Sequence, residues 1–163
     1  MTNYINLFTE CTINNKWAGT PLEKYAALGT RQRGAFSELA VKQILSELGF
    51  NIESPQNPGH DFIMNGIKTE LKFGLTTGRN NNWRTMFNHI GLEKDWEQLV
   101  LACINGDLKF RIVLIKRDNF SKDLLQHQQG GNKSENDDYM ISGVRAREAL
   151  FDSNAEVLYT NEF

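Results

Sequence analysis

A two-residue turn, Asn65-Gly66, lies between two short runs of alternating character in the segment GHDFIMNGIKTELKFG, residues 59–74. Asn-Gly is typical of type I′ turns, in which both central residues take positive φ angles, and such a turn fixes how the flanking strands pair. The resulting register places Asp61 directly opposite Glu70. The turn therefore predicts a hairpin in which two carboxylates are cross-strand partners, with Cβ atoms about 4.5–5.5 Å apart.

The two faces of this hairpin differ in chemistry. Side chains alternate along a strand, so Lys72 shares a face with Asp61 and Glu70. We expect the opposite face to be core, since it carries Phe62, Met64, Ile67, Thr69, Leu71 and Phe73. Like charges directly opposite one another destabilise a strand pair. The acids are explained either by a divalent cation between them, since Mg²⁺ favours carboxylate oxygens, or by a solvated face on which they are tolerated.

Residues 34–49, GAFSELAVKQILSELG, predict an amphipathic helix that ends at Gly49. Its apolar side comprises Phe36, Ala40, Val41, Ile44, Leu45 and Leu48. Glu38 lies at the edge of this stripe, three residues before Val41. An acid there either reaches over the sheet toward the hairpin carboxylates or is an ordinary residue at the border of the surface.

The remaining segments predict a mixed α/β domain. A polar loop is expected at 126–138, and short helices over 83–90 (WRTMFNHI) and 142–151 (SGVRAREALF). Strands are expected at 50–53 (FNIE), at 97–105 (EQLVLACIN) and 108–116 (LKFRIVLIK) around a turn at Gly106-Asp107, and at 155–160 (AEVLYT).

Composition narrows the function classes. The chain has 163 residues, 40% of them hydrophobic, which fits a single domain over 1–163. A net charge of −2 argues against a general polyanion binder, although residues 68–94 hold five Lys or Arg against two acids. No apolar run approaches the ~20 residues of a membrane span, and no secretory signal is visible, so we expect a cytoplasmic location. Cys11 and Cys103 lack metal-type spacing, and Cys103 is expected to be a reduced core residue.

Several of these features together resemble the PD-(D/E)XK nuclease superfamily, and most of all a small Type II restriction endonuclease. The residues are Glu38 in GAFSELA, Asp61 in NPGHDF and Glu70-Leu71-Lys72 in TELKFG. The expected order of helix, three strands, helix and strand looks like the αβββαβ core of that family. The resemblance covers about 30–116, with 1–29 as an N-terminal extension and 117–163 as DNA-contact or dimer elements. His60 stands where the family usually has proline.

The resemblance implies a Mg²⁺-dependent endonuclease that hydrolyses DNA phosphodiester bonds at a specific sequence. Asp61 and Glu70 would hold Mg²⁺, for which Mn²⁺ is expected to substitute, with the backbone carbonyl of Leu71 as a further ligand. Lys72 would position or activate the attacking water. Glu38 would either contact these ligands without binding the metal itself or bind a second metal. No covalent intermediate is implied.

Polar loops supply candidate DNA contacts, because Asn and Arg suit both phosphate binding and bidentate reading of A and G. The candidates are Arg79, Asn80, Asn81, Asn82, Arg84, Asn88, His89, Gln128, Asn132, Lys133, Arg145 and Arg147. The alternative is that they form an ordinary polar loop and a solvated helix surface. Trp83 and Phe87 are expected to be core residues and not stacking platforms.

The implied partner is double-stranded DNA, cut by a homodimer that matches a twofold site. The same core serves junction resolvases, repair nucleases and homing enzymes, so a structure-specific nuclease stays open. A rival of another class is a non-catalytic DNA-binding module with a decayed site. The presence of every acid and the lysine favours the enzyme. The mildly acidic charge and asparagine-rich loops favour base reading over binding through backbone charge alone.

Overall fold

The computed structural model describes residues 16–80, 83–127 and 138–161. The chain divides into two compact units, Met1–Arg33 and Gly34–Phe163. The first contains the short helix α2 (Glu23–Ala26) and the start of helix α3 (Thr30–Glu47). All of the predicted site residues belong to the second unit. No helix in the described ranges is long and apolar enough to cross a membrane.

A mixed sheet forms the centre of the second unit. Among the described residues, six strands follow the order β1-β2-β3-β5-β6-β9. Their bounds are β1 Ile52–Glu53, β2 Phe62–Met64, β3 Ile67–Leu75, β5 Gln98–Ile104, β6 Phe110–Lys116 and β9 Glu156–Asn161. Strands β3 and β5 are parallel, and the other neighbours are antiparallel. The mixed α/β class and the strands expected around Gly106-Asp107 are confirmed.

A second, smaller sheet has the order β4-β8-β7. It is built from β4 (Thr85–Gly91), β7 (Gln126–His127) and β8 (Asp138–Gly143), and helix α4 (Val144–Leu150) follows directly. Two 3₁₀ turns, η2 (Arg117–Asn119) and η3 (Lys122–Leu124), connect β6 to β7. The helix expected over 142–151 and the strand expected over 155–160 are confirmed as α4 and β9.

The hairpin follows its turn chemistry. Asn65 and Gly66 have φ angles of 52° and 82°, as a type I′ turn requires. The β2–β3 ladder has the predicted pairs 62–69, 63–68 and 64–67. Strand β2 begins at Phe62, so the fourth expected pair, Asp61 with Glu70, is not part of the ladder. The Asp61 backbone N–H donates instead to the Thr69 carbonyl, at 3.0 Å.

Helix α3 is longer than expected and buries a narrower face. It begins at Thr30, and Val41 and Leu45 are 1% and 0% exposed. The ends of the predicted stripe are largely exposed, with Phe36 at 55% and Leu48 at 45%.

The expectation of a helix over 83–90 was wrong, because this segment contains strand β4. Thr85 and Phe87 are buried while Met86 and Asn88 are exposed, which is the period of a strand. The strand pairs with β8, and its register shifts between Phe87 and Ile90. The connection from β3 to the parallel β5 therefore contains a strand where the αβββαβ order has a helix.

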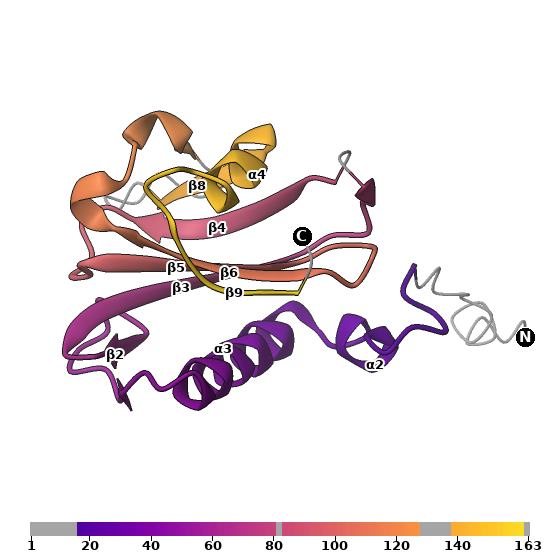
Figure 1. Ribbon diagram of the computed structural model, residues 1–163, viewed down its shortest axis with the longest axis horizontal. Helices are drawn as coiled ribbons and strands as arrows, with labels where there is room; N and C mark the ends of the chain where they lie inside the picture. The colour runs from indigo at the N-terminus through magenta and orange to yellow at the C-terminus, as the bar shows by residue number, and fades with distance from the viewer. Residues whose placement is uncertain (1–15, 81–82, 128–137, 162–163) are drawn as a thin grey trace, which may run out of the picture. The chain divides into compact units, whose positions relative to one another are not determined.

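The six-stranded sheet is covered on both faces. Helix α3 lies against one face, and β4, β8 and α4 lie against the other (Figure 1). The α3-side cluster comprises Val41, Leu45, Phe62, Met64, Leu71, Val100, Ala102, Ile112 and Leu114. The β4-side cluster includes Trp83, Phe87, Leu99, Leu101, Cys103, Val113 and Ile141. The expected core positions of Trp83, Phe87 and Cys103 are confirmed, and burial on both faces accounts for the continuous apolar runs of β5 and β6.

Candidate active site

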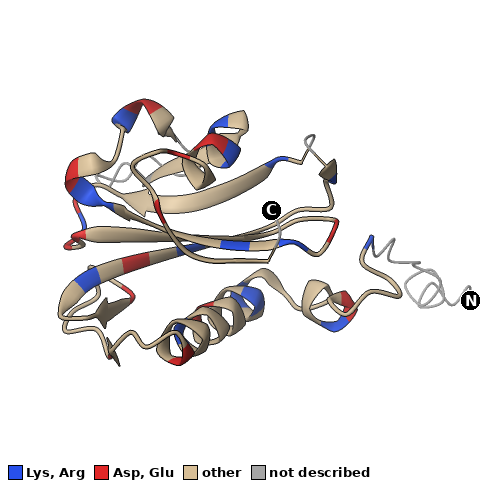
Figure 2. Ribbon diagram, viewed as in Figure 1, with Lys and Arg blue, Asp and Glu red and all other residues tan. Residues whose placement is uncertain are grey.

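The site is centred on Glu70, in the first half of β3. Basic and acidic positions follow one another along this strand (Figure 2). Glu70 is 1% exposed and pairs in register with Leu99, a member of the β4-side cluster. Its Oε1 accepts hydrogen bonds from Lys72 Nζ at 2.6 Å and from Lys94 Nζ at 3.4 Å. Burial of a carboxylate is costly unless it is paired, and these two lysines supply the hydrogen bonds that offset the burial of Glu70.

Asp61 lies beside Glu70 at the open edge of β3. Because β2 begins at Phe62, which pairs with Thr69, the β3 backbone has no β2 partner beyond Thr69 on this edge. The Asp61 carboxylate fills this gap, and its Oδ2 accepts a hydrogen bond from Leu71 N at 2.7 Å. The side chain of Asp61 is thereby fixed against the residue that lies between Glu70 and Lys72.

Among the residues that the structure describes, a lysine joins Glu38 to the hairpin. Its Oε1 pairs with Lys42 Nζ at 2.5 Å, and the same Nζ donates to the Asp61 carbonyl at 3.2 Å. The Lys42 ammonium also lies 5.3 Å from the centre of the Phe62 ring. Lys42 was not singled out by sequence reasoning, although its i+4 spacing from Glu38 is the usual signal of a helix ion pair.

Two of these acids have oxygen atoms that suit a metal ion. Within the described ranges, no three His, Cys, Asp or Glu side chains form a metal-ligating group, so Glu38 does not complete a three-acid site. Asp61 Oδ1 and Glu70 Oε2 receive no hydrogen bond from any residue that the structure describes. Two carboxylates with a free oxygen each, completed by water, are a usual Mg²⁺ ligand set. The donors of Asp61 and Glu70 fit Mg²⁺ in that form.

Lys94 reaches Glu70 from a braced loop between β4 and β5. Arg117 Nη1 donates to the carbonyls of Lys94 at 2.9 Å and Trp96 at 2.7 Å, and Nη2 donates to Leu92 O. The Arg117 guanidinium lies 4.4 Å from the Trp96 ring centre. Sequence reasoning missed both Lys94 and Arg117, because no local motif links either residue to Glu70.

A second ion pair joins β3 to the same loop. Lys68 Nζ lies 2.8 Å from Asp95 Oδ2, which also accepts a hydrogen bond from Asn57 at 3.0 Å. The hydrogen bond with Asp95 raises the pKa of Lys68. The hydrogen bonds from Lys68 and then Asn57 lower the pKa of Asp95. Asp95 is exposed and Lys68 partly exposed, so this pair contributes little to stability.

His60, in the position of the family's proline, is 3% exposed. Its Nε2 accepts a hydrogen bond from Gln56 N at 3.2 Å, so the proton of the neutral ring is assigned to Nδ1. In the described parts of the chain Nδ1 is buried without a hydrogen-bond acceptor. The ring is held as a packed residue next to Asp61.

The candidate DNA contacts are distributed over several surfaces. Arg79, Asn80, Arg84, Asn88, His89 and Arg145 have exposed side chains, while Asn81, Asn82, Gln128, Asn132 and Lys133 lie outside the described residues. Arg147 is only partly exposed, and its guanidinium lies 5.8 Å from the Trp83 ring centre. The structure brings Asn80 and Arg147, which are far apart in sequence, to the wall of one hollow.

No family model and no curated protein matches this chain. The resemblance to the PD-(D/E)XK superfamily therefore rests on the residues of the site. Asp61, Glu70 and Lys72 are brought together around Leu71. Glu38 is joined to them through Lys42 and the Asp61 carbonyl.

Proposed function

We propose that this chain is a Mg²⁺-dependent, sequence-specific endodeoxyribonuclease of the PD-(D/E)XK type. The observation that carries the proposal is a buried Glu70 paired with Lys72, beside an Asp61 carboxylate bound to the intervening Leu71 N–H. A sheet that needed only stability would gain more from an apolar side chain on this covered face. Helix α3, the β1–β3 meander and the parallel β5 support the family's core, with β4 in place of its second helix.

In this proposal Asp61 Oδ1 and Glu70 Oε2 hold the metal, together with the Leu71 carbonyl. Bound Mg²⁺, or Mn²⁺ in its place, supplies charge for the phosphate and a more acidic water. Lys72 Nζ has three N–H groups and uses one on Glu70. The others are left to orient the attacking water and to stabilise charge that develops on the phosphate. Glu38 acts indirectly, by holding Lys42 against the Asp61 carbonyl.

Lys94 adds a second positive charge at Glu70. Its side chain is 38% exposed, compared with 15% for Lys72. An ammonium that is partly open to solvent and anchored through a braced loop is suited to a non-bridging phosphate oxygen. The substrate is double-stranded DNA, and a homodimer would place one such site on each strand.

A second candidate is a non-catalytic DNA-binding module. One observation favours it: Glu70 Oε1 is bound by two lysines, as in an ion-pair network whose role is purely structural. The two candidates differ in whether Asp61 Oδ1 and Glu70 Oε2 are needed. The nuclease requires both oxygens to hold Mg²⁺. Binding without cleavage needs neither of them.

The test is incubation of the full chain with plasmid DNA and Mg²⁺, with a parallel reaction in which EDTA removes the metal. Discrete bands that disappear with EDTA, in Asp61→Asn and in Lys72→Gln, are expected. Lys68→Gln is the matched control, because Lys68 lies on the same strand but pairs with the exposed Asp95. A smear would indicate a nonspecific nuclease. DNA that is bound but left intact, including branched substrates, would overturn the enzyme in favour of the module.

A further inference from the structure

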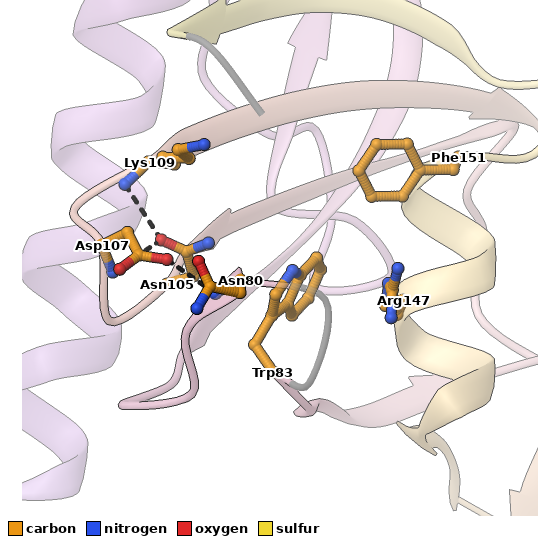
Figure 3. Close-up of a pocket in the computed structure, with 7 residues that line it drawn as sticks. All are labelled: Asn80, Trp83, Asn105, Asp107, Lys109, Arg147 and Phe151. Carbon is orange, nitrogen blue, oxygen red and sulfur yellow. Dashed lines mark hydrogen bonds between the residues drawn. The ribbon is translucent and has the colours of Figure 1, made fainter.

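A hollow of about 350 Å³ lies at the opposite end of β3 from the carboxylate site. It is bounded by Asn80 and Trp83, by the turn between β5 and β6, and by Arg147 and Phe151 on and directly after helix α4 (Figure 3). Glu70 is five residues before Leu75, the last residue of β3. At about 3.3 Å per residue this is a separation of roughly 16 Å along the strand. The hollow is thus distinct from the proposed catalytic site.

Asn105 provides the most specific feature of this hollow. The residue is 1% exposed, and its Oδ1 accepts hydrogen bonds from the backbone N–H groups of Asp107 and Lys109, both at 3.0 Å. These bonds fix the orientation of the amide, whose oxygen is turned toward the turn (Figure 3). Asn105 Nδ2 has no acceptor among the residues that the structure describes. Asn105 lines the hollow, so a ligand with an acceptor at this point would gain a hydrogen bond from Nδ2.

Asp107 places an acceptor beside that donor. Its Oδ2 accepts a hydrogen bond from Asn80 N at 2.7 Å, and its side chain is exposed. A fixed amide donor next to a carboxylate acceptor matches a molecule that presents an acceptor and an N–H group on one edge. The Watson–Crick edges of nucleobases have this pattern, and carboxylates and amides are side chains that read bases.

The other walls suit a planar ring and an anion. The Phe151 ring is 46% exposed, with the Arg111 guanidinium 4.4 Å and the Trp83 ring 6.4 Å from its centre. Lys109 and Arg147 bring two cationic side chains to the same hollow. Aromatic rings favour stacked or edge contacts with planar groups, and Arg and Lys bind phosphate.

We propose that this hollow binds a nucleotide. The edge of the base contacts Asn105 Nδ2 and Asp107, its ring packs against Phe151, and its phosphate is held by Lys109 and Arg147. The nucleotide is either free or part of a DNA strand, and a DNA strand as its source rests on the proposed nuclease function.

The experiment is titration of the full chain with the four deoxynucleoside monophosphates and with short single-stranded oligonucleotides, followed by calorimetry and tryptophan fluorescence. Asn105→Asp keeps an oxygen for both backbone N–H groups and replaces the amide donor with a carboxylate oxygen. We expect it to weaken binding at least about tenfold, and Lys109→Gln to weaken it several-fold. Lys116→Gln, an exposed change at the end of β6, is the control. Thermal unfolding checks that each variant is folded.

The outcomes distinguish a free nucleotide from a DNA strand as the ligand. They also distinguish failure of the nucleotide pocket from failure of the proposed nuclease. Mononucleotides that bind as tightly as oligonucleotides indicate a free ligand, and binding of oligonucleotides alone indicates a strand. Asp61→Asn is expected to lose cleavage and keep nucleotide binding. Nucleotide binding in a chain that never cuts DNA would retain the pocket and overturn the nuclease. Equal binding by wild type and a folded Asn105→Asp, or by inorganic phosphate and nucleotides, would overturn the pocket even if DNA is cut.

Discussion

The two faces of β3 are both covered, yet their chemistry differs. Toward α3 the strand presents Leu71 and Phe73 to an apolar cluster. Toward β4 it presents Glu70, Lys72 and Gly74. The close neighbours of Gly74 on β4 are Thr85 and Phe87. Only the first face has the composition that best stabilises a fold. Apolar residues of similar size would stabilise the fold at least as well as this buried charged pair. The charges on this face therefore point to a functional role.

The largest expected effect is on the charged face. Glu70→Gln keeps the shape of the side chain and removes the charge that is proposed to hold Mg²⁺. We expect the rate of DNA cleavage to fall on the order of 10³-fold, since both the metal and the partner of Lys72 are weakened. Cleavage rates at several Mg²⁺ concentrations measure it. Wild-type rates in Glu70→Gln would mean that both faces of β3 serve structure only.

The apolar face should respond in the opposite way. Leu45 is 0% exposed in the α3-side cluster, so Leu45→Ala leaves a cavity there. We expect the free energy of unfolding to fall by about 3–5 kcal/mol, measured by denaturant titration, with cleavage per folded molecule unchanged. Leu39→Ala on the same helix is the control, because Leu39 is 67% exposed. Equal losses in both variants would show that α3 does not pack as described.

The pKa of the Cys103 thiol reports how well the β4-side cluster is shielded from water. Burial raises the pKa of its thiol from 9.0 to about 12. Between these pH values the unfolded chain loses a proton that the folded chain keeps, so stability is full below about pH 9 and falls by about 1.4 kcal/mol per pH unit above it. Unfolding curves at pH 8 and pH 10 measure the slope. Cys103→Ala should lack this component, and an identical slope in both proteins would contradict the burial.

Lys94→Gln should give the smallest effect of the series. It removes one of the two ammonium groups at Glu70 and leaves the bracing of the loop by Arg117 in place, because that bracing uses backbone carbonyls. We expect cleavage to fall several-fold, up to about tenfold, with the stability change within about 1 kcal/mol. The cleavage rate of Lys94→Gln, compared with that of the control Lys68→Gln, measures this loss. A larger loss of stability than of activity would assign Lys94 to the structure of the charged face alone.

Prediction from the sequence succeeded where a few neighbouring residues decide the structure. Asn65-Gly66 specified the β2–β3 register, and continuous apolar runs indicated β5 and β6. It failed at β4, where Trp83, Phe87 and Ile90 have the spacing of a helix face. The register shift after Phe87 hides the alternation of the strand, and its partner β8 is about fifty residues away in sequence. No local pattern contains that pairing.

The carboxylate site shows the same division. The sequence by itself placed Glu70 and Lys72 on one face of one strand, because turn geometry and strand alternation act over a few residues. It paired Asp61 with Glu70 across the hairpin, whereas in the structure Asp61 lies outside the ladder and accepts a hydrogen bond from Leu71 N. Only the tertiary structure decided that this face is covered, that Lys94 approaches Glu70, and that Asn105 lines a hollow with Arg147. These contacts join segments 24 to 42 positions apart. Their geometry depends on how β4, α4 and the loops between strands pack onto the sheet, which no short stretch of sequence specifies.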